Sequence, residues 1–136
     1  MSPYICSLPN ISDAYHKPAE EVTTGVSCEV CLPVDSTYDL GVVVVEPGYS
    51  TPEQTVMEPN SLTIQILIEC DHAELRVVRA DGKVEYYTFT SSSKKGTAVE
   101  IYYQDTMQWL NLGDYPLVFL EECHPPFNEN RYRNNS

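Results

Sequence analysis

Two stretches of the sequence, LTIQILIE at 62–69 and MQWLNL at 107–112, carry polar and aromatic side chains at every second position. Alternate side chains of a strand point to one face, so each stretch would present a chemically mixed face. A buried amide without a partner costs about 1–3 kcal/mol, so such amides should meet a partner, water or a ligand. The residues on these faces are Thr63, Gln65 and Leu67, then Met107, Trp109 and Asn111. This lining suits an organic ligand with a large apolar body, although Met107 and Trp109 could equally be plain core filling.

Three titratable side chains near these stretches are candidates for proton transfer. Glu69 ends the first stretch; in apolar surroundings its pKa would rise, whereas at a solvated strand end it would have no such role. Tyr103 comes shortly before the second stretch and could donate a hydrogen bond or a proton. His124 follows the last apolar run and precedes two prolines, where a structural or surface role is the alternative.

Other kinds of site lack their sequence signals. We find no Gly-rich phosphate loop, no GxSxG turn, and no serine with an evident histidine partner. Cys28 and Cys31 form a lone CxxC, which leaves structural thiols, a redox pair or a metal site as alternatives. The five cysteines are odd in number and irregularly spaced, which fits a reducing cytoplasm better than a disulfide framework.

Charge narrows the choice of partners. The chain has 8 Lys plus Arg against 20 Asp plus Glu, a net charge of −12, which repels nucleic acid and acidic membrane surfaces. No stretch has the order of a secretory signal, and no apolar run is long enough to span a membrane. We therefore expect a cytoplasmic protein without nucleic-acid or membrane partners.

Short strands must position these residues. YDLGVVVVEP at 38–47 is nearly continuous in apolar residues and predicts a strand buried on both faces. Asp81-Gly82 separates two strand-like runs and predicts a tight type I′ hairpin turn. With no convincing helix of ten residues, the pattern predicts an antiparallel sandwich or barrel. We divide the chain into an N-terminal arm over 1–36, a barrel over 37–128 and a polar tail over 129–136.

The order of the turns resembles the cupin superfamily. PGYSTPEQTV at 47–56 resembles the start of the first cupin motif, and IQILIEC at 64–70 resembles the end of its strand. NLGDYPLVFLEECHPPF at 111–127 is similar to the usual end of the domain. The resemblance implies an all-β fold, a cupin-like double-stranded β-helix (jelly-roll) barrel with an N-terminal extended arm, and pairing into a homodimer.

The sequence departs from the cupin pattern at the metal ligands. The two histidines of the first motif become Gln54 and Val56, and its glutamate falls at about Thr63. The histidine of the second motif becomes Met107. A hard amide oxygen with a soft thioether suits no common ion, so we expect no metal and no cofactor. Gln54 and Val56 instead join the residues expected to bind the ligand.

These observations favour a metal-independent cupin-type enzyme that acts on a small, largely hydrophobic organic molecule. A cyclase or isomerase of a natural-product-like substrate fits best, because such chemistry needs only shape, a proton donor or acceptor and exclusion of water. The alternatives are a non-catalytic small-molecule-binding cupin, a sugar isomerase or epimerase, and a structural module that dimerises. The few arginines disfavour a nucleotide-sugar substrate.

Overall fold

The structure is a computed structural model that describes residues 11–33 and 37–135, with side chains over 18–30 and 37–135. Every regular element in these ranges is a strand. None of the described segments forms a helix long and apolar enough to cross a membrane. The strands are β1 (Ile11–Thr23), β2 (Val26–Pro33), β3 (Asp39–Val45), β4 (Glu53–Val56), β5 (Leu62–Glu69), β6 (His72–Val78), β7 (Val84–Thr90), β8 (Ala98–Tyr102), β9 (Thr106–Asn111), β10 (Leu117–His124) and β11 (Tyr132–Asn135).

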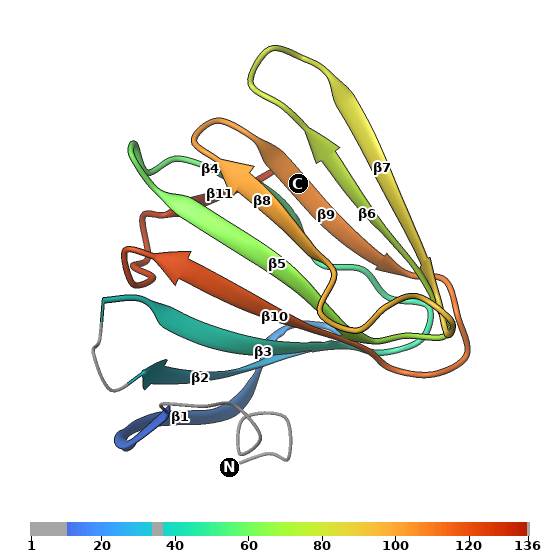
Figure 1. Ribbon diagram of the computed structural model, residues 1–136, viewed down its shortest axis with the longest axis horizontal. Coiled ribbons are helices and arrows are strands. Elements are labelled where there is room, and N and C mark those ends of the chain that lie inside the picture. The colour runs from blue at the N-terminus through green and yellow to red at the C-terminus, as the bar shows by residue number, and fades with distance from the viewer. Residues whose placement is uncertain (1–10, 34–36, 136) are drawn as a thin grey trace.

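The strands form two antiparallel sheets that lie face to face (Figure 1). The six-stranded sheet has the order β1-β2-β3-β10-β5-β8, and the five-stranded sheet has the order β11-β4-β9-β6-β7. Strands that neighbour one another in a sheet are mostly not consecutive in the chain, as in a jelly roll. The predicted all-β jelly-roll class is confirmed.

Burial follows the apolar pattern of each strand. In β3 every residue except Val44 is buried, which confirms the prediction of a strand covered on both faces. The main core lies between the sheets, and a smaller cluster of Leu40, Val42, Val118 and Leu120 lies on the opposite face of β3 and β10. Strands β5 and β9 alternate, so that their inner side chains are fully buried while the intervening ones are half-buried.

The hairpin between β6 and β7 forms as predicted, but its turn differs in type. Gly82 has a φ of +91° and donates its N–H to Arg79 O, and Arg79 N–H donates to Lys83 O. This is a three-residue loop closed by a left-handed glycine, not a two-residue type I′ turn. Arg79 then pairs with the buried Asp105 at 2.7 Å and ties the hairpin to the turn before β9.

The two ends of the chain differ from the sequence prediction. The predicted extended arm contains a hairpin, β1–β2, and β2 continues the sheet by pairing with β3. Residues 1–10 and 34–36 of that arm lie outside the described residues, as does Ser136. The predicted polar tail over 129–136 contains strand β11, which pairs with β4 from Tyr132↔Val56 to Asn135↔Glu53. Backbone pairing places both segments in the sheets.

Candidate functional site

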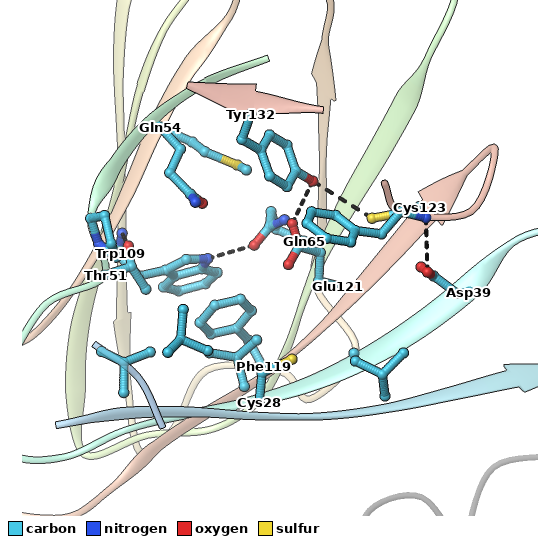
Figure 2. A pocket seen from close by; sticks show the side chains of 18 of the residues that line it. Cys28, Asp39, Thr51, Gln54, Gln65, Trp109, Phe119, Glu121, Cys123 and Tyr132 are labelled. Atoms are coloured by element: carbon cyan, nitrogen blue, oxygen red, sulfur yellow. Dashed lines mark hydrogen bonds between the residues drawn. The ribbon is translucent and has the colours of Figure 1, made fainter. Parts of the chain in front are cut away.

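A cavity of about 500 Å³ lies between the two sheets, within the size range of small-molecule sites. The β1–β2 hairpin forms one wall, and the remaining walls come from β3, β10, β5, β9 and the C-terminal segment. Figure 2 shows the side chains that converge on it. Its lining includes Glu20, Glu21, Val22, Val26, Cys28, Val30, Asp39, Gly41, Val43, Thr51, Pro52, Gln54, Gln65, Met107, Trp109, Phe119, Glu121, Cys123, Phe127 and Tyr132.

The strand register places the polar side chains of the six-stranded sheet in one area. Glu121 of β10 pairs with Gln65 of β5 on one side and with Gly41 of β3 on the other. In the adjacent inner row, Cys123 lies between Thr63 and Asp39. Since cross-strand neighbours on one face lie about 5 Å apart, these side chains form a compact polar cluster. Gly41 contributes no side chain, and a Cβ at this position would lie 3.1 Å from Cys28 Sγ.

A short hydrogen bond joins the two sheets at this cluster. Tyr132, on β11 of the opposite sheet, donates its hydroxyl to Glu121 Oε1 at 2.6 Å (Figure 2). The same hydroxyl lies 3.1 Å from Thr63 Oγ1 and 3.6 Å from Cys123 Sγ. The pair therefore places a carboxyl group and a phenol together on the cavity wall.

Burial shifts the acidities in this cluster in one direction. Desolvation raises the pKa of Glu121, while the hydrogen bond from Tyr132, the nearby Gln65 amide and the charge of Arg131 oppose the rise. Desolvation also raises the pKa of Asp39, opposed by the Phe127 N–H that it accepts at 2.8 Å. The pKa of Tyr132 lies well above its usual value because the hydroxyl is buried beside Glu121. The pKa of each carboxyl group therefore lies above that of the same acid in water.

Aromatic rings and one amide form the next part of the wall. Trp109 stacks on Phe119 with ring centroids 4.6 Å apart, and its Nε1 donates to Gln65 Oε1 at 2.9 Å. This bond fixes the orientation of the Gln65 amide, whose Nε2 is buried and forms no hydrogen bond of ordinary geometry with the described residues. Gln65 is 2% exposed and lines the cavity, so this donor is shielded from bulk water.

A buried arginine supports the cluster from behind. Arg131 is fully buried, and its Nη2 donates to Thr63 Oγ1 at 3.0 Å and to Leu62 O at 2.9 Å. Its Nη1 donates to Pro125 O and forms an ion pair with Glu58 at 2.8 Å. Arg131 is not part of the cavity wall; its contacts hold β11, and with it Tyr132, against β5.

The structure brings four of the predicted ligand-binding residues to the cavity: Gln54, Gln65, Met107 and Trp109. Gln54 and Met107 are cross-strand partners on β4 and β9, and the Gln54 amide donates to Asn134 Oδ1 at 3.0 Å. Thr63 is buried behind the cavity wall, where its hydroxyl contacts that of Tyr132, a lining residue. The period-two reasoning therefore found the correct face of each strand.

Three other predicted ligand-binding residues have structural roles. Val56 and Leu67 are buried in the main core and do not line the cavity. Asn111 donates through Nδ2 to Val45 O and Tyr115 O and accepts the Gly113 N–H at Oδ1. Those bonds fix the turn before β10, so they leave little of the Asn111 amide for a ligand.

The predicted proton-transfer residues lie outside the cavity wall. Glu69 is exposed at the end of β5, and Tyr103 is 39% exposed in the turn between β8 and β9. His124 lies on the opposite face of β10 from Glu121, where it contacts Glu122 at 2.6 Å and stacks on Tyr38. The titratable side chains that do line the cavity include Glu121 and Tyr132.

Sequence reasoning missed Glu121, Tyr132 and Asp39. Glu121 had a signal: a strand as apolar as PLVFLEEC is covered on both faces, and of two adjacent glutamates one must point inward. Tyr132 had none, because the polar segment around it shows no strand period. Asp39 begins a buried strand and lies at alternate positions with Gly41 and Val43. Its side chain could therefore have been predicted to point to the same inner face.

The residues at the cupin metal positions do not fit a transition-metal ion. Val56 is a hydrocarbon in the core, and Thr63 accepts hydrogen bonds from the permanently charged Arg131. Gln54 and Met107 offer only an amide and a thioether. Across the described residues, no three His, Cys, Asp or Glu side chains are grouped to hold a metal. We therefore build no catalytic step on a bound metal. Cys70 and Cys123 are thiols without a disulfide, whereas the side chain of Cys31 lies outside the described residues.

Comparison with known proteins supports the fold. No protein-family model matches the sequence, and no curated protein matches it. Oxalate decarboxylase from Bacillus subtilis matches in structure with a TM-score of 0.67 and 22% identity over 87% of this chain. CapF from Staphylococcus aureus, a capsular polysaccharide assembling protein, matches with a TM-score of 0.70 and 15% identity over 86% of this chain. Both are cupin-fold proteins. This chain has a cupin fold.

The chain spans about a third of the length of these cupin structures, 29% of the oxalate decarboxylase and 34% of CapF. At such identities the likeness establishes the fold alone. The expected homodimer, the cytoplasmic location, and the absence of nucleic-acid and membrane partners stay predictions.

Proposed function

We propose that this chain is a metal-independent cupin-type enzyme that binds a small, largely apolar organic molecule and isomerises or cyclises it. The observation that carries the proposal is the Glu121–Tyr132 hydrogen bond of 2.6 Å on the wall of the cavity. Trp109 and Phe119 contribute apolar side chains to the same cavity, so a ligand packed against their edges would lie beside an acid–base pair.

The proposed chemistry needs only these side chains. The ionised carboxyl of Glu121 takes a proton from one atom of the substrate, and the electron pair left behind shifts to a new bond. The same proton returns at another atom, so neither step requires an oxidant, a reductant or a net proton. The raised pKa of Glu121 brings the carboxyl nearer the range in which it both accepts and returns a proton. Tyr132 keeps the carboxyl oriented, and a ligand that fills the cavity would displace water from it.

Two other functions are less well supported. A nucleotide-sugar isomerase would need cationic side chains around the diphosphate, but the described lining residues include no lysine or arginine. A non-catalytic binding protein would use the same Trp109 and Gln65 contacts, so only turnover separates it from an enzyme.

The test is deuterium exchange from D₂O into carbon positions of a library of small aromatic and aliphatic amines, alcohols and ketones, read by mass spectrometry. Wild type should label at least one compound. Glu121→Gln keeps the shape and still accepts the Tyr132 hydrogen bond, but it cannot take a proton, so labelling should fall about 100-fold or more. Glu122→Gln, on the opposite face of β10, is the matched control and should keep it.

Binding without labelling by wild type would leave only the non-catalytic function. Stoichiometric iron, manganese, zinc or nickel in the purified protein would contradict the metal-independent part.

A further inference from the structure

The described wall of the cavity carries negative charge. Glu21 of β1, Asp39 of β3 and Glu121 of β10 all line it. No lysine, arginine or histidine is among the described residues that form the wall. The chain as a whole has a net charge of −12, so the surrounding field has the same sign as the cavity. An anionic ligand would be repelled at each stage of binding.

The buried cation behind the cavity wall, Arg131, already has partners for its charge and its hydrogen-bond donors. Arg131 is fully buried behind Thr63, pairs with Glu58 at 2.8 Å and donates its remaining hydrogen bonds to carbonyl and hydroxyl oxygens. His124 lies on the other face of β10, with Glu122. Neither group presents a donor to a molecule in the cavity, although the charge of Arg131, from behind the wall, lowers the pKa of Glu121 and of Asp39.

The uncharged part of the wall is also suited to a cation. Phe119 stacks on Trp109, whose indole reaches Gln65 directly, and Tyr132 comes from the opposite sheet (Figure 2). Phe127 and Tyr132 pack at 5.8 Å between ring centroids. Ring faces attract cationic groups through their quadrupoles, most strongly when water is excluded. The same faces accept the apolar body of an amine.

An independent sign of a ligand comes from Gln65. Its Nε2 is buried and forms no hydrogen bond of ordinary geometry with described residues, although the amide lies near enough to Glu121 to lower the pKa of that carboxyl. A buried amide donor in this condition costs free energy that a ligand acceptor would recover. The ligand therefore needs an oxygen or nitrogen acceptor on its body in addition to its charge.

We propose that the molecule bound in this cavity is a protonated amine on an aromatic or branched alkyl body, with its ammonium group at Asp39 and Glu121 and a hydrogen-bond acceptor at Gln65. This proposal rests on the proposed small-molecule site and names the chemical class of its ligand. It excludes carboxylates and phosphorylated sugars as the preferred ligands.

Binding of an ammonium group would be linked to pH. Glu121 faces Asp39, Cys123 and Tyr132, and its pKa is raised in the free protein. A cation favours the ionised carboxylate, so its binding would release a proton from Glu121. The affinity for an amine should therefore rise with pH through the pKa of Glu121, whereas the affinity for a neutral analogue should stay constant.

The experiment uses Trp109, the only tryptophan of the chain, as a reporter inside the cavity. Fluorescence titrations of the full chain with 2-phenylethylamine, 2-phenylethanol and phenylacetate compare a cation, a neutral molecule and an anion on one phenyl body. At neutral pH the amine should bind about tenfold or more tightly than the alcohol, and phenylacetate should bind most weakly. Glu121→Gln should reduce the preference for the amine to about threefold or less, and Glu122→Gln should retain it.

Equal or tighter binding of the alcohol or of phenylacetate would overturn the proposal while leaving the small-molecule site intact. An undiminished preference for the amine in both Glu121→Gln and Asp39→Asn would also overturn it; the second variant covers a folding failure of the first. If none of the three probes changes Trp109 fluorescence at about millimolar concentration, both this inference and the proposed function fail.

Discussion

The hydrogen bond between Trp109 and Gln65 allows a prediction whose sign is unusual for a buried pair. Both side chains are 2% exposed, and the Nε1–Oε1 distance is 2.9 Å. Trp109→Phe removes the only donor to Gln65 Oε1 among the described residues and leaves both ends of the amide without a hydrogen bond. Removal of one partner of a buried hydrogen bond costs about 1–3 kcal/mol, and the smaller ring adds a cavity penalty.

Gln65→Leu should then restore stability in the Trp109→Phe background. The leucine removes both unpaired amide groups, so the double variant should be about 1–3 kcal/mol more stable than Trp109→Phe alone. In the wild-type background the same change leaves Trp109 Nε1 unpaired but also removes the unpaired Gln65 Nε2, so the two effects offset each other. The cavity penalty of the smaller ring is common to both arms and cancels in the double-mutant cycle.

Urea unfolding followed by far-UV circular dichroism measures all four proteins without relying on tryptophan fluorescence. Gln54→Leu is the matched control, because Gln54 bonds to Asn134 near the surface and should not couple to Trp109. A coupling free energy below about 0.5 kcal/mol, or further destabilisation of Trp109→Phe by Gln65→Leu, would refute the assignment of Gln65 as an under-satisfied amide.

Two further predictions concern charge. Because burial raises the pKa of Glu121 above its ordinary value of 4.5, the unfolded chain ionises first as pH rises. The contribution of Glu121 is therefore fully present below pH 4.5 and is lost as pH rises through the folded pKa. Thermal melts between those values should show a shallower pH dependence for Glu121→Gln and an unchanged one for Glu122→Gln; parallel curves for all three proteins would contradict the shift. Arg131→Met should lower the free energy of unfolding in urea by about 3–5 kcal/mol, because it strands Glu58 and several acceptors. Arg133→Met, at an exposed position, should cost less than about 0.5 kcal/mol. Equal losses of unfolding free energy in the two variants would show that the contacts of Arg131 do not stabilise the fold.

The fold could be predicted from the sequence wherever the burial of side chains determines the structure. The continuous apolar run of β3 and the alternation in β5 and β9 result from burial, which acts on side chains and so leaves a readable pattern. This pattern predicted the inward faces of β5 and β9 correctly, and these faces carry Gln65 and Trp109. The turn at Asp81-Gly82 was located because glycine there adopts a positive φ, although its loop length depends on the pairing of Arg79 with Lys83.

The rest of the site depends on contacts between distant segments. β11 is a polar segment that becomes a strand only because β4 offers it an unpaired backbone edge. The β1–β2 hairpin contains Pro18 and many charged residues, which disfavour a strand by propensity. Glu121 acquires its chemistry from Tyr132, eleven residues later in the chain and on the other sheet. No local pattern contains that relationship.

The hairpin that walls the cavity also gives the protein two levels of stability. Among the described strands, β1 lies at the edge of its sheet and has one partner, β2, and their register is interrupted three times. Opening β1 breaks only this pairing and leaves the strands that carry Glu121, Gln65 and Trp109 in place. Its free energy of opening is thus a fraction of that of global unfolding. The amides of this edge strand should consequently exchange with solvent sooner than those of β3 or β10.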